Sequence, residues 1–369
     1  MDILDTDKQW KKPGNEDSEK EVKDKHKHVN MRYQIPTHFH GDIDNAVIFH
    51  CMENPRGYLG EYEDSYIDKE LGGADLEEYF GKTYKLLNED NSSNKSIKEI
   101  IKERYQLGEG ELDSKNLKKN ITNIIYSDKS NLSRELDNLF SREEKFFEEE
   151  YNLKKNKNSN NSVLSEEYYY MAQYYAQLLE IDGKNLRKLK DKPGYENTES
   201  RKKTRKIAKK ICNLEIYPFS CKNPKLGDDG IGKKILLNSD LSRLGAYIVL
   251  RRIYKYLEEK NDKSQKPVFI FRKYDRAWKN LFENIFKEVK EKNQNFDNKL
   301  VLSLLEKGFF YCQTGQQGGG ITSGNVISIK NYKIYNDIFK NLKETAFEEI
   351  SDVLRRGDID KNSSGKSGD

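Results

Sequence analysis

Residues 46–57 read Ala-Val-Ile-Phe-His-Cys-Met-Glu-Asn-Pro-Arg-Gly, and this stretch decides the expected fold. Its first seven residues form an apolar run without helical periodicity, which is typical of a buried strand. The Asn-Pro pair with a glycine soon after indicates a tight turn. Three similar runs follow at residues 210–217, 267–271 and 308–312. We therefore predict four buried strands, each ending in a loop rich in Pro, Gly, Asn or Gln.

Helical patterns lie between these strands. Apolar residues recur at steps of three and four over residues 239–260 and 277–292, and residues 165–180 and 334–354 are further candidates. Alternation of strands and helices is typical of right-handed crossovers and a parallel sheet. The sequence thus predicts an α/β fold built on a four-stranded parallel sheet.

In such sheets, ligands bind beyond the carboxyl ends of the strands. The loops at 53–62, 218–232 and 313–325 should therefore share one edge of the sheet. This convergence is the main reason to expect a functional site there.

Composition limits the remaining possibilities. The 369 residues include 66 basic and 62 acidic side chains, a net charge of +4, so contact with nucleic acid requires a local basic patch. The cysteines are far apart and without a CxxC pair, which favours reduced thiols over a zinc or iron–sulfur site. No cofactor motif, signal peptide or membrane-spanning run is visible, which favours a cytoplasmic location. The four cysteines are Cys51, Cys212, Cys221 and Cys312.

Charge and polar runs suggest the domain organisation. Residues 1–29 and 357–369 are expected to be disordered charged tails. The stretch 67–162 is too long and too charged for a simple crossover, and it is predicted to be a helical insertion. The α/β domain would then comprise residues 30–66 and 163–356.

The first loop after a strand offers groups for chemistry. Asn54 could hold a water molecule, Glu53 could polarise it, and Tyr58 or Tyr62 could stack on a planar ligand. Arg56 could contact a DNA phosphate. An ordinary turn with packed tyrosines is the alternative.

Polar residues also occur within the second strand. Asn213 and Glu215 interrupt an apolar run, where unpaired polar groups are costly. Either their polar atoms are satisfied inside the protein, or they line a polar pocket. An asparagine there could read a base edge with one donor and one acceptor.

The ends of the other two strands could contact phosphates. Arg272 and Lys273 follow the third strand, where they could bind an anion or form surface ion pairs. The Gly- and Gln-rich loop after the fourth strand could donate backbone N–H groups to DNA, or it could simply be flexible. Its candidate contacts are Gln313, Gln316, Gln317 and Thr322.

Two weaker patterns stay open. His38 and His40 could bind a metal ion, but no third ligand has a readable spacing, so a structural role is the alternative. The basic run 201–206 could touch phosphates or form a solvated helical face.

The order of these motifs resembles the uracil-DNA glycosylase superfamily. Residues 35–42, Ile-Pro-Thr-His-Phe-His-Gly-Asp, lead through the first strand to Asn-Pro-Arg-Gly at 54–57, like the opening of that fold. Residues 213–220 are similar to the family's Asn-Leu strand motif, and the loop at 313–325 takes the place of its last motif. The resemblance covers residues 31–62 and 205–345.

The resemblance implies a three-layer α/β/α sandwich and an enzyme that flips a base out of DNA and hydrolyses its N-glycosidic bond. It assigns Asn54 to positioning water, Tyr58 or Tyr62 to stacking, and Asn213 to reading the base. Arg56 is an insertion relative to the family's Asn-Pro-Gly.

The last motif departs from the family because it lacks the histidine of the fastest members, and its glutamines cannot act as an acid. We therefore expect slow activity, an unusual base specificity or a loss of activity. The large insertion suggests a specialised substrate of modified or damaged DNA, such as a modified phage genome in antiphage defence. The alternative is a non-catalytic nucleic-acid or nucleotide-binding module of the same fold.

Overall fold

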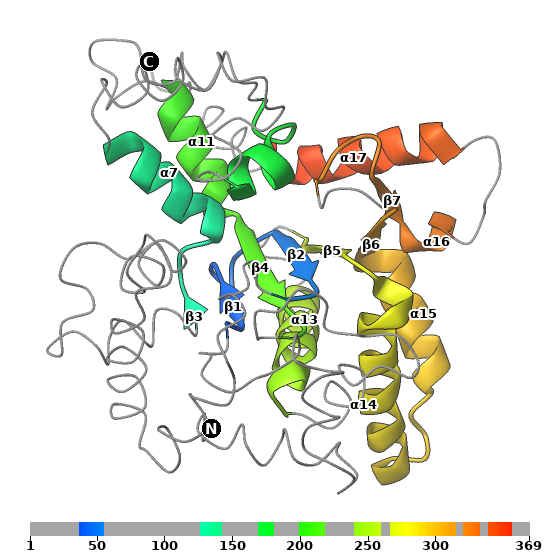
Figure 1. Cartoon of the computed structure of the whole chain (residues 1–369). Coiled ribbons are helices and arrows are strands. Elements are labelled where there is room, and N and C mark those ends of the chain that lie inside the picture. Colours follow the sequence, from blue (N-terminus) through cyan, green and yellow to red (C-terminus); the bar gives the residue numbers. More distant parts are fainter. Residues whose placement is uncertain are drawn as a thin grey trace, which may run out of the picture.

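The computed structural model describes residues 37–54, 126–141, 169–180, 199–217, 240–259, 266–314, 320–332 and 339–355. These residues form an α/β protein around one seven-stranded mixed sheet in the order β3-β1-β4-β2-β5-β6-β7 (Figure 1). The strands are β1 (Phe39–His40), β2 (Ile48–Met52), β3 (Tyr126–Ser127), β4 (Ile211–Glu215), β5 (Val268–Phe271), β6 (Phe310–Gln313) and β7 (Val326–Ser328).

The four predicted strands are confirmed and form the centre of the sheet. Strand β2 pairs in parallel with β4 and β5, and β5 pairs in parallel with β6. The predicted number of strands is too low, because β1 and β7 add antiparallel neighbours at either side of the four central strands and β3 pairs with β1. These additional strands have two or three residues each, too few for a hydrophobic period to be readable.

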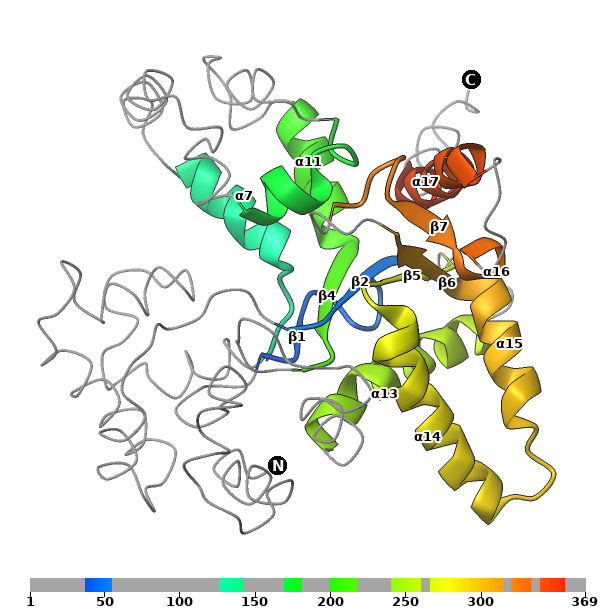
Figure 2. The ribbon, with the colours of Figure 1, turned by 45° about the vertical axis from the view of Figure 1, so that its right-hand side comes forward.

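Helices cover both faces of the sheet (Figures 1 and 2). On one side lie α13 (Asp240–Glu258), α14 (Trp278–Lys292) and α15 (Asn298–Phe309), with the short α16 (Ile329–Tyr332). On the other lie α7 (Asn131–Ser141), the π-helix η3 (Tyr170–Tyr175), α11 (Glu199–Lys209) and α17 (Phe339–Arg355). A 3-10 turn, η5 (Tyr274–Arg276), joins β5 to α14.

Most of the predicted helices are present. The patterns at 239–260, 277–292 and 334–354 correspond to α13, α14 and α17, whereas the described part of 165–180 contains a π-helix. Helix α15 was not predicted, whereas α7 lies in the range expected to be helical and α11 matches the helical alternative for the basic run 201–206. No described helix is long and apolar enough to cross a membrane. The cysteines among the described residues, Cys51, Cys212 and Cys312, are buried and free.

Part of the range predicted as an insertion belongs to the sheet and its core. Strand β3 pairs with β1, and α7 contributes Leu132, Leu136 and Leu139 to the same buried cluster as η3 and α17. These leucines recur at steps of four and three, so α7 buries one stripe against the sheet. Residues 126–141 are therefore integral to the α/β fold.

The turn between β1 and β2 explains the Gly-Asp pair of the sequence motif. Gly41 has a φ of +128°, and a Cβ there would lie 2.6 Å from the carbonyl oxygen of Ile211, so only glycine fits. Asp42 Oδ1 then accepts the backbone N–H groups of Asp44 and Asn45, each at 3.0 Å. Both residues of the pair thus shape a turn at the amino end of β2.

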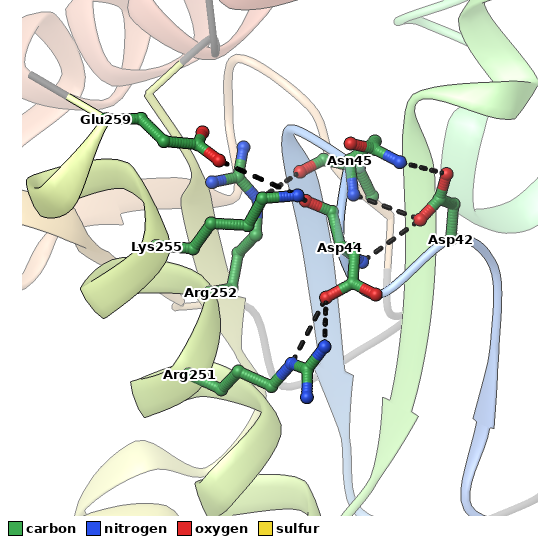
Figure 3. Close-up of polar contacts among 8 residues, drawn as sticks. Asp42, Asp44, Asn45, Arg251, Arg252, Lys255 and Glu259 are labelled. Atoms are coloured by element: carbon green, nitrogen blue, oxygen red, sulfur yellow. Dashed lines mark hydrogen bonds and ion pairs between the residues drawn. The ribbon is translucent and has the colours of Figure 1, made fainter.

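Helix α13 anchors this turn (Figure 3). The guanidinium of Arg251 bonds the carboxylate of Asp44 at 2.8 Å, and the buried Arg252 donates from Nε to the carbonyl oxygen of Ala46 at 3.1 Å. Lys255 Nζ approaches the carbonyl oxygen of Asp44 at 3.4 Å. The charged groups of α13 therefore fix the amino end of β2, at the edge of the sheet opposite the candidate site.

Candidate functional site

The carboxyl ends of the four central strands lie at one edge of the sheet. Neighbouring strands there end at Glu215, Met52, Phe271 and Gln313, in the order β4, β2, β5, β6. The prediction that these strand ends are neighbours is confirmed. Most of the connecting loops lie outside the described residues, including 55–62 and 218–232.

Glu53, directly after β2, is the most strongly paired carboxylate at this edge. Its side chain is 9% exposed and lies 2.9 Å from Lys273 Nζ and 3.5 Å from Arg272 Nη2, both at the end of β5. Lys273 adopts a left-handed backbone with φ of +47°, which is unfavourable for a residue with a side chain. Of the two alternatives for Arg272 and Lys273, the structure shows ion pairing, with Glu53 as the common partner.

Glu215, the last residue of β4, is a second carboxyl at this edge. It is 2% exposed, and within the described part of the chain its Oε2 has no hydrogen-bond partner. Burial raises the pKa of Glu215 well above its usual value; Arg272 opposes this shift and Glu53 adds to it. A buried carboxyl oxygen without a hydrogen-bond partner is costly, and such groups call for an explanation in terms of function or a bound molecule.

A chain of polar side chains crosses the sheet beneath this edge. Asn131 donates its backbone N–H to Asn213 Oδ1 at 3.1 Å, and Asn213 Nδ2 donates to the hydroxyl of Tyr175 at 2.5 Å. The same hydroxyl lies 3.0 Å from His50 Nδ1, and His50 Nε2 lies 3.2 Å from Gln313 Nε2. Three strands, α7 and η3 are thereby linked through buried hydrogen bonds.

His50, at the centre of this chain, is a neutral imidazole near neutral pH. Burial, with a further contribution from the positive charge of Arg272, lowers its pKa to about 3. The contact with Gln313 works in the opposite direction but is outweighed. The ring therefore acts as a hydrogen-bonding link between Tyr175 and Gln313, without a charge of its own.

The π-helix η3 brings tyrosines to the polar part of the sheet. Both carboxylate oxygens of the buried Glu135, on α7, accept backbone N–H groups at the start of this helix, from Tyr170 at 2.8 Å and Met171 at 2.7 Å. A negative charge is stabilising at a helix N-terminus. On the same helix the hydroxyl of Tyr174 accepts a hydrogen bond from Arg272 Nη1 at 3.2 Å. Helix α7 thus positions η3 over the sheet.

The described end of the Gly- and Gln-rich loop packs on η3. Ile321 donates its backbone N–H to the carbonyl oxygen of Tyr174 at 2.8 Å. Ser323 receives a hydrogen bond from Gln177 Nε2 at 3.1 Å and donates its own N–H to Gln177 Oε1 at 2.9 Å. Thr322 lies within this segment, and its predicted contact with DNA stays a prediction.

The predicted site residues have different outcomes. Asn54 is half-buried beside Glu53 at the end of β2, and the rest of its predicted turn, residues 55–57, lies outside the described residues. Asn213 faces inward, and its amide bonds Tyr175 and Asn131, which is the internally satisfied alternative. Five predicted residues lie outside the described part of the chain, namely Arg56, Tyr58, Tyr62, Gln316 and Gln317.

Gln313 is placed within the sheet, where its side chain contacts His50 instead of projecting into a loop. His38 and His40 are buried on β1 or directly before it. Among the described residues, no group of three or more His, Cys, Asp or Glu side chains could hold a metal ion.

Several residues of this region were missed as site residues by sequence reasoning. His50, Tyr174 and Tyr175 contribute contacts that span the sheet, and Glu215 was considered only as an internally satisfied group or as part of the lining of a polar pocket. A usable signal exists in retrospect, because His50, Asn213 and Glu215 occupy alternate strand positions that face the same side.

This edge of the sheet brings together chemically distinct groups from the ends of β2, β4 and β5. A carboxylate held by two cations, an amide at the strand end and a buried carboxyl suit the handling of a polar substrate with developing charge. No protein-family model, curated protein or solved structure matches the chain.

Proposed function

We propose that this chain is a DNA glycosylase, which hydrolyses the N-glycosidic bond of a uracil or modified base flipped out of DNA. The observation that carries the proposal is the placement of Glu53 and Asn54 at the end of β2, beside Arg272 and Lys273 at the end of β5. The parallel centre of the sheet and the helices on both its faces are compatible with the three-layer sandwich of the uracil-DNA glycosylase superfamily.

The reaction needs a negative charge and an oriented water molecule close to the sugar. As the base leaves, positive charge develops on the sugar ring, and a fixed carboxylate stabilises it. Glu53 meets this requirement, because its ion pairs hold the carboxylate in place. Asn54, the adjacent residue, supplies an amide that can orient the attacking water.

The two cations suit the phosphate backbone on either side of a flipped nucleotide. The side chains of Arg272 and Lys273 are 32% and 48% exposed, so each can contact a phosphate while it remains beside Glu53. Since the net charge of the chain is only +4, local cations of this kind are what a DNA complex requires.

The test is cleavage of defined oligonucleotides. The purified full chain is incubated with duplex and single-stranded DNA containing uracil or modified bases, and abasic sites are revealed by alkali. We expect cleavage of at least one substrate, and a loss of about 10²-fold or more for Asn54→Ala and for Glu53→Gln.

Asp44→Asn is the matched control, because Asp44 lies in the turn at the opposite edge of the sheet. This variant should retain the wild-type rate. If a folded wild-type protein produces no abasic site on any of the bases, including modified phage DNA, the glycosylase proposal is wrong.

Binding without chemistry is the second candidate, and the double ion pairing of Glu53 favours it, since an occupied carboxylate is less available to water. In that case Arg272→Ala and Lys273→Ala should weaken DNA binding and reduce its salt dependence. Asn54→Ala should then leave the affinity measured by fluorescence anisotropy unchanged.

A further inference from the structure

Glu215 lies at the same edge of the sheet as Glu53 and Asn54, but the proposed function gives it no role. It ends β4 directly opposite Met52 of β2, one residue before Glu53. The backbone N–H of Tyr217 donates to the carbonyl oxygen of Glu53 at 2.8 Å, so these two strand ends are held side by side. The two carboxyls therefore belong to one edge.

The surroundings of Glu215 leave its carboxyl without an adequate counter-charge. Among the residues that the structure describes, Arg272 is the cation that acts on it, and that guanidinium also pairs with Glu53 and bonds Tyr174. Tyr170 and Tyr174, on η3, interact electrostatically with Glu215 as neutral hydroxyls, because burial raises the pKa of both.

The strands on either side add no positive charge. His38 accepts the backbone N–H of Glu215 with its carbonyl oxygen at 3.0 Å, and burial lowers the pKa of its imidazole to about 4, so the ring is neutral. On β2, the buried thiol of Cys51 has a raised pKa and is also neutral. The burial of Glu215 therefore favours its protonated form, whereas Glu53 lies between two cations.

Two neighbouring carboxyls in different environments are the usual arrangement for an acid and a base in one reaction. Building on the proposed glycosylase function, we propose that Glu215 is the general acid that protonates the leaving base. This assigns an acid to a site whose last sequence motif lacks a histidine.

In the proposed step, Glu53 acts as the base as well as stabilising the sugar cation, and Glu215 acts as the acid. Water forms a bond to the sugar carbon and gives its proton to the Glu53 carboxylate. The carbon–nitrogen bond breaks, its electron pair stays with the base, and the proton of Glu215 moves to a ring nitrogen or carbonyl oxygen of that base. The base leaves neutral, and one proton passing from Glu53 to Glu215 restores the starting state.

This role predicts the class of base. Protonation helps most when the leaving anion is strongly basic, so poor leaving groups depend on Glu215 more than acidic pyrimidines do. We expect substrates such as thymine-like or other electron-rich modified bases to need this residue, and 5-fluorouracil to need it least.

The test compares Glu215→Gln with wild type on DNA carrying 5-fluorouracil, uracil, 5-hydroxymethyluracil or thymine. The variant should lose about 10²-fold or more on the poorest leaving group among the bases cleaved, and little on 5-fluorouracil. Wild-type activity should also fall as pH rises through the raised pKa of Glu215, and the variant should lack this alkaline loss. Glu306→Gln is the matched control, because this buried carboxyl bonds Tyr274 within the other core cluster.

The outcomes separate the two proposals. Active wild type with an equal loss on every base, or with no loss, would overturn the acid role and leave the glycosylase function standing. Wild type that is inactive on every base would overturn both. Parallel pH dependences of unfolding for wild type and Glu215→Gln would show an ionised Glu215 and would overturn the acid role regardless of activity.

Discussion

The two faces of the central sheet differ sharply, although both are formed by alternating residues of the same four strands. The face toward α13, α14 and α15 is apolar, whereas the face toward α7, η3 and α17 mixes aliphatic and polar side chains. The apolar face carries Phe49, Cys51, Cys212, Leu214, Phe269, Phe271, Phe310 and Cys312. The mixed face carries His50, Asn213, Glu215 and Gln313 among Ile48, Met52, Ile211, Val268 and Ile270.

This difference shows how one sheet separates stability from chemistry. On the apolar face the rings of Phe269, Phe271, Phe310 and Phe282 lie with centroids 4.8 to 6.5 Å apart, so packing provides the stabilisation. On the mixed face, hydrogen bonds link Asn213 through Tyr175 to His50 and Gln313, whereas Glu215 Oε2 has no partner among the described residues. Mutations on the two faces should therefore act by different mechanisms.

The largest effect is expected on the apolar face. Phe271→Ala removes a fully buried ring from between Phe310, Trp278 and Phe282 and leaves a cavity. We expect the free energy of unfolding to fall by about 3–5 kcal/mol, measured by urea denaturation at pH 7.

Tyr254→Ala is the control, because this side chain is 62% exposed on α13 and its removal should change stability by less than about 0.5 kcal/mol. A comparable change in the two variants would contradict the assignment of the stabilising packing to this face.

The second effect is a loss of stability in acid that comes from the histidines. The pKa values of His50 and His38 are lowered to about 3 and about 4 by burial, from a usual value near 6.5. The contribution of these two neutral imidazoles to the free energy of unfolding is complete above about pH 6.5. It is lost as pH falls toward their pKa values in the folded protein, because the histidines of the unfolded chain take up protons first.

His50→Gln should remove part of this dependence. Between pH 7 and pH 4, wild type should lose about 2–4 kcal/mol more than the variant, measured from urea midpoints at each pH. Only the difference between the two slopes is diagnostic, since the substitution also changes stability at pH 7. Parallel slopes would mean that His50 is not held neutral in the folded protein.

The sequence predicts the strands of the sheet and their ends much better than it predicts the polar contacts on the mixed face. Strands β2, β4, β5 and β6 are readable because strands buried on both sides give continuous apolar runs, even with one polar residue included. Glu53 and Asn54 are found because strand ends of a parallel sheet meet at one edge.

The polar chain, in contrast, depends on contacts between distant segments. Tyr175 lies 125 residues from His50 and 38 from Asn213 along the chain, and no local pattern indicates that one hydroxyl joins both. The place of α7 in the core was missed for a related reason: its three core leucines are embedded in a charged region, and their burial depends on η3 and the sheet. Tertiary contacts, which no local pattern contains, decide these features.

The smallest effect tests whether the polar chain acts as a unit. Asn213→Ala and Tyr175→Phe each remove one side of the 2.5 Å hydrogen bond, and each should cost about 1–3 kcal/mol in urea unfolding. If the hydroxyl joins Asn213 to His50, the double variant should be less destabilised than the sum of the single variants, by about 1 kcal/mol. Additive losses would mean that the two side chains contribute independently. The mixed face would then be a set of separate polar contacts and not a connected network.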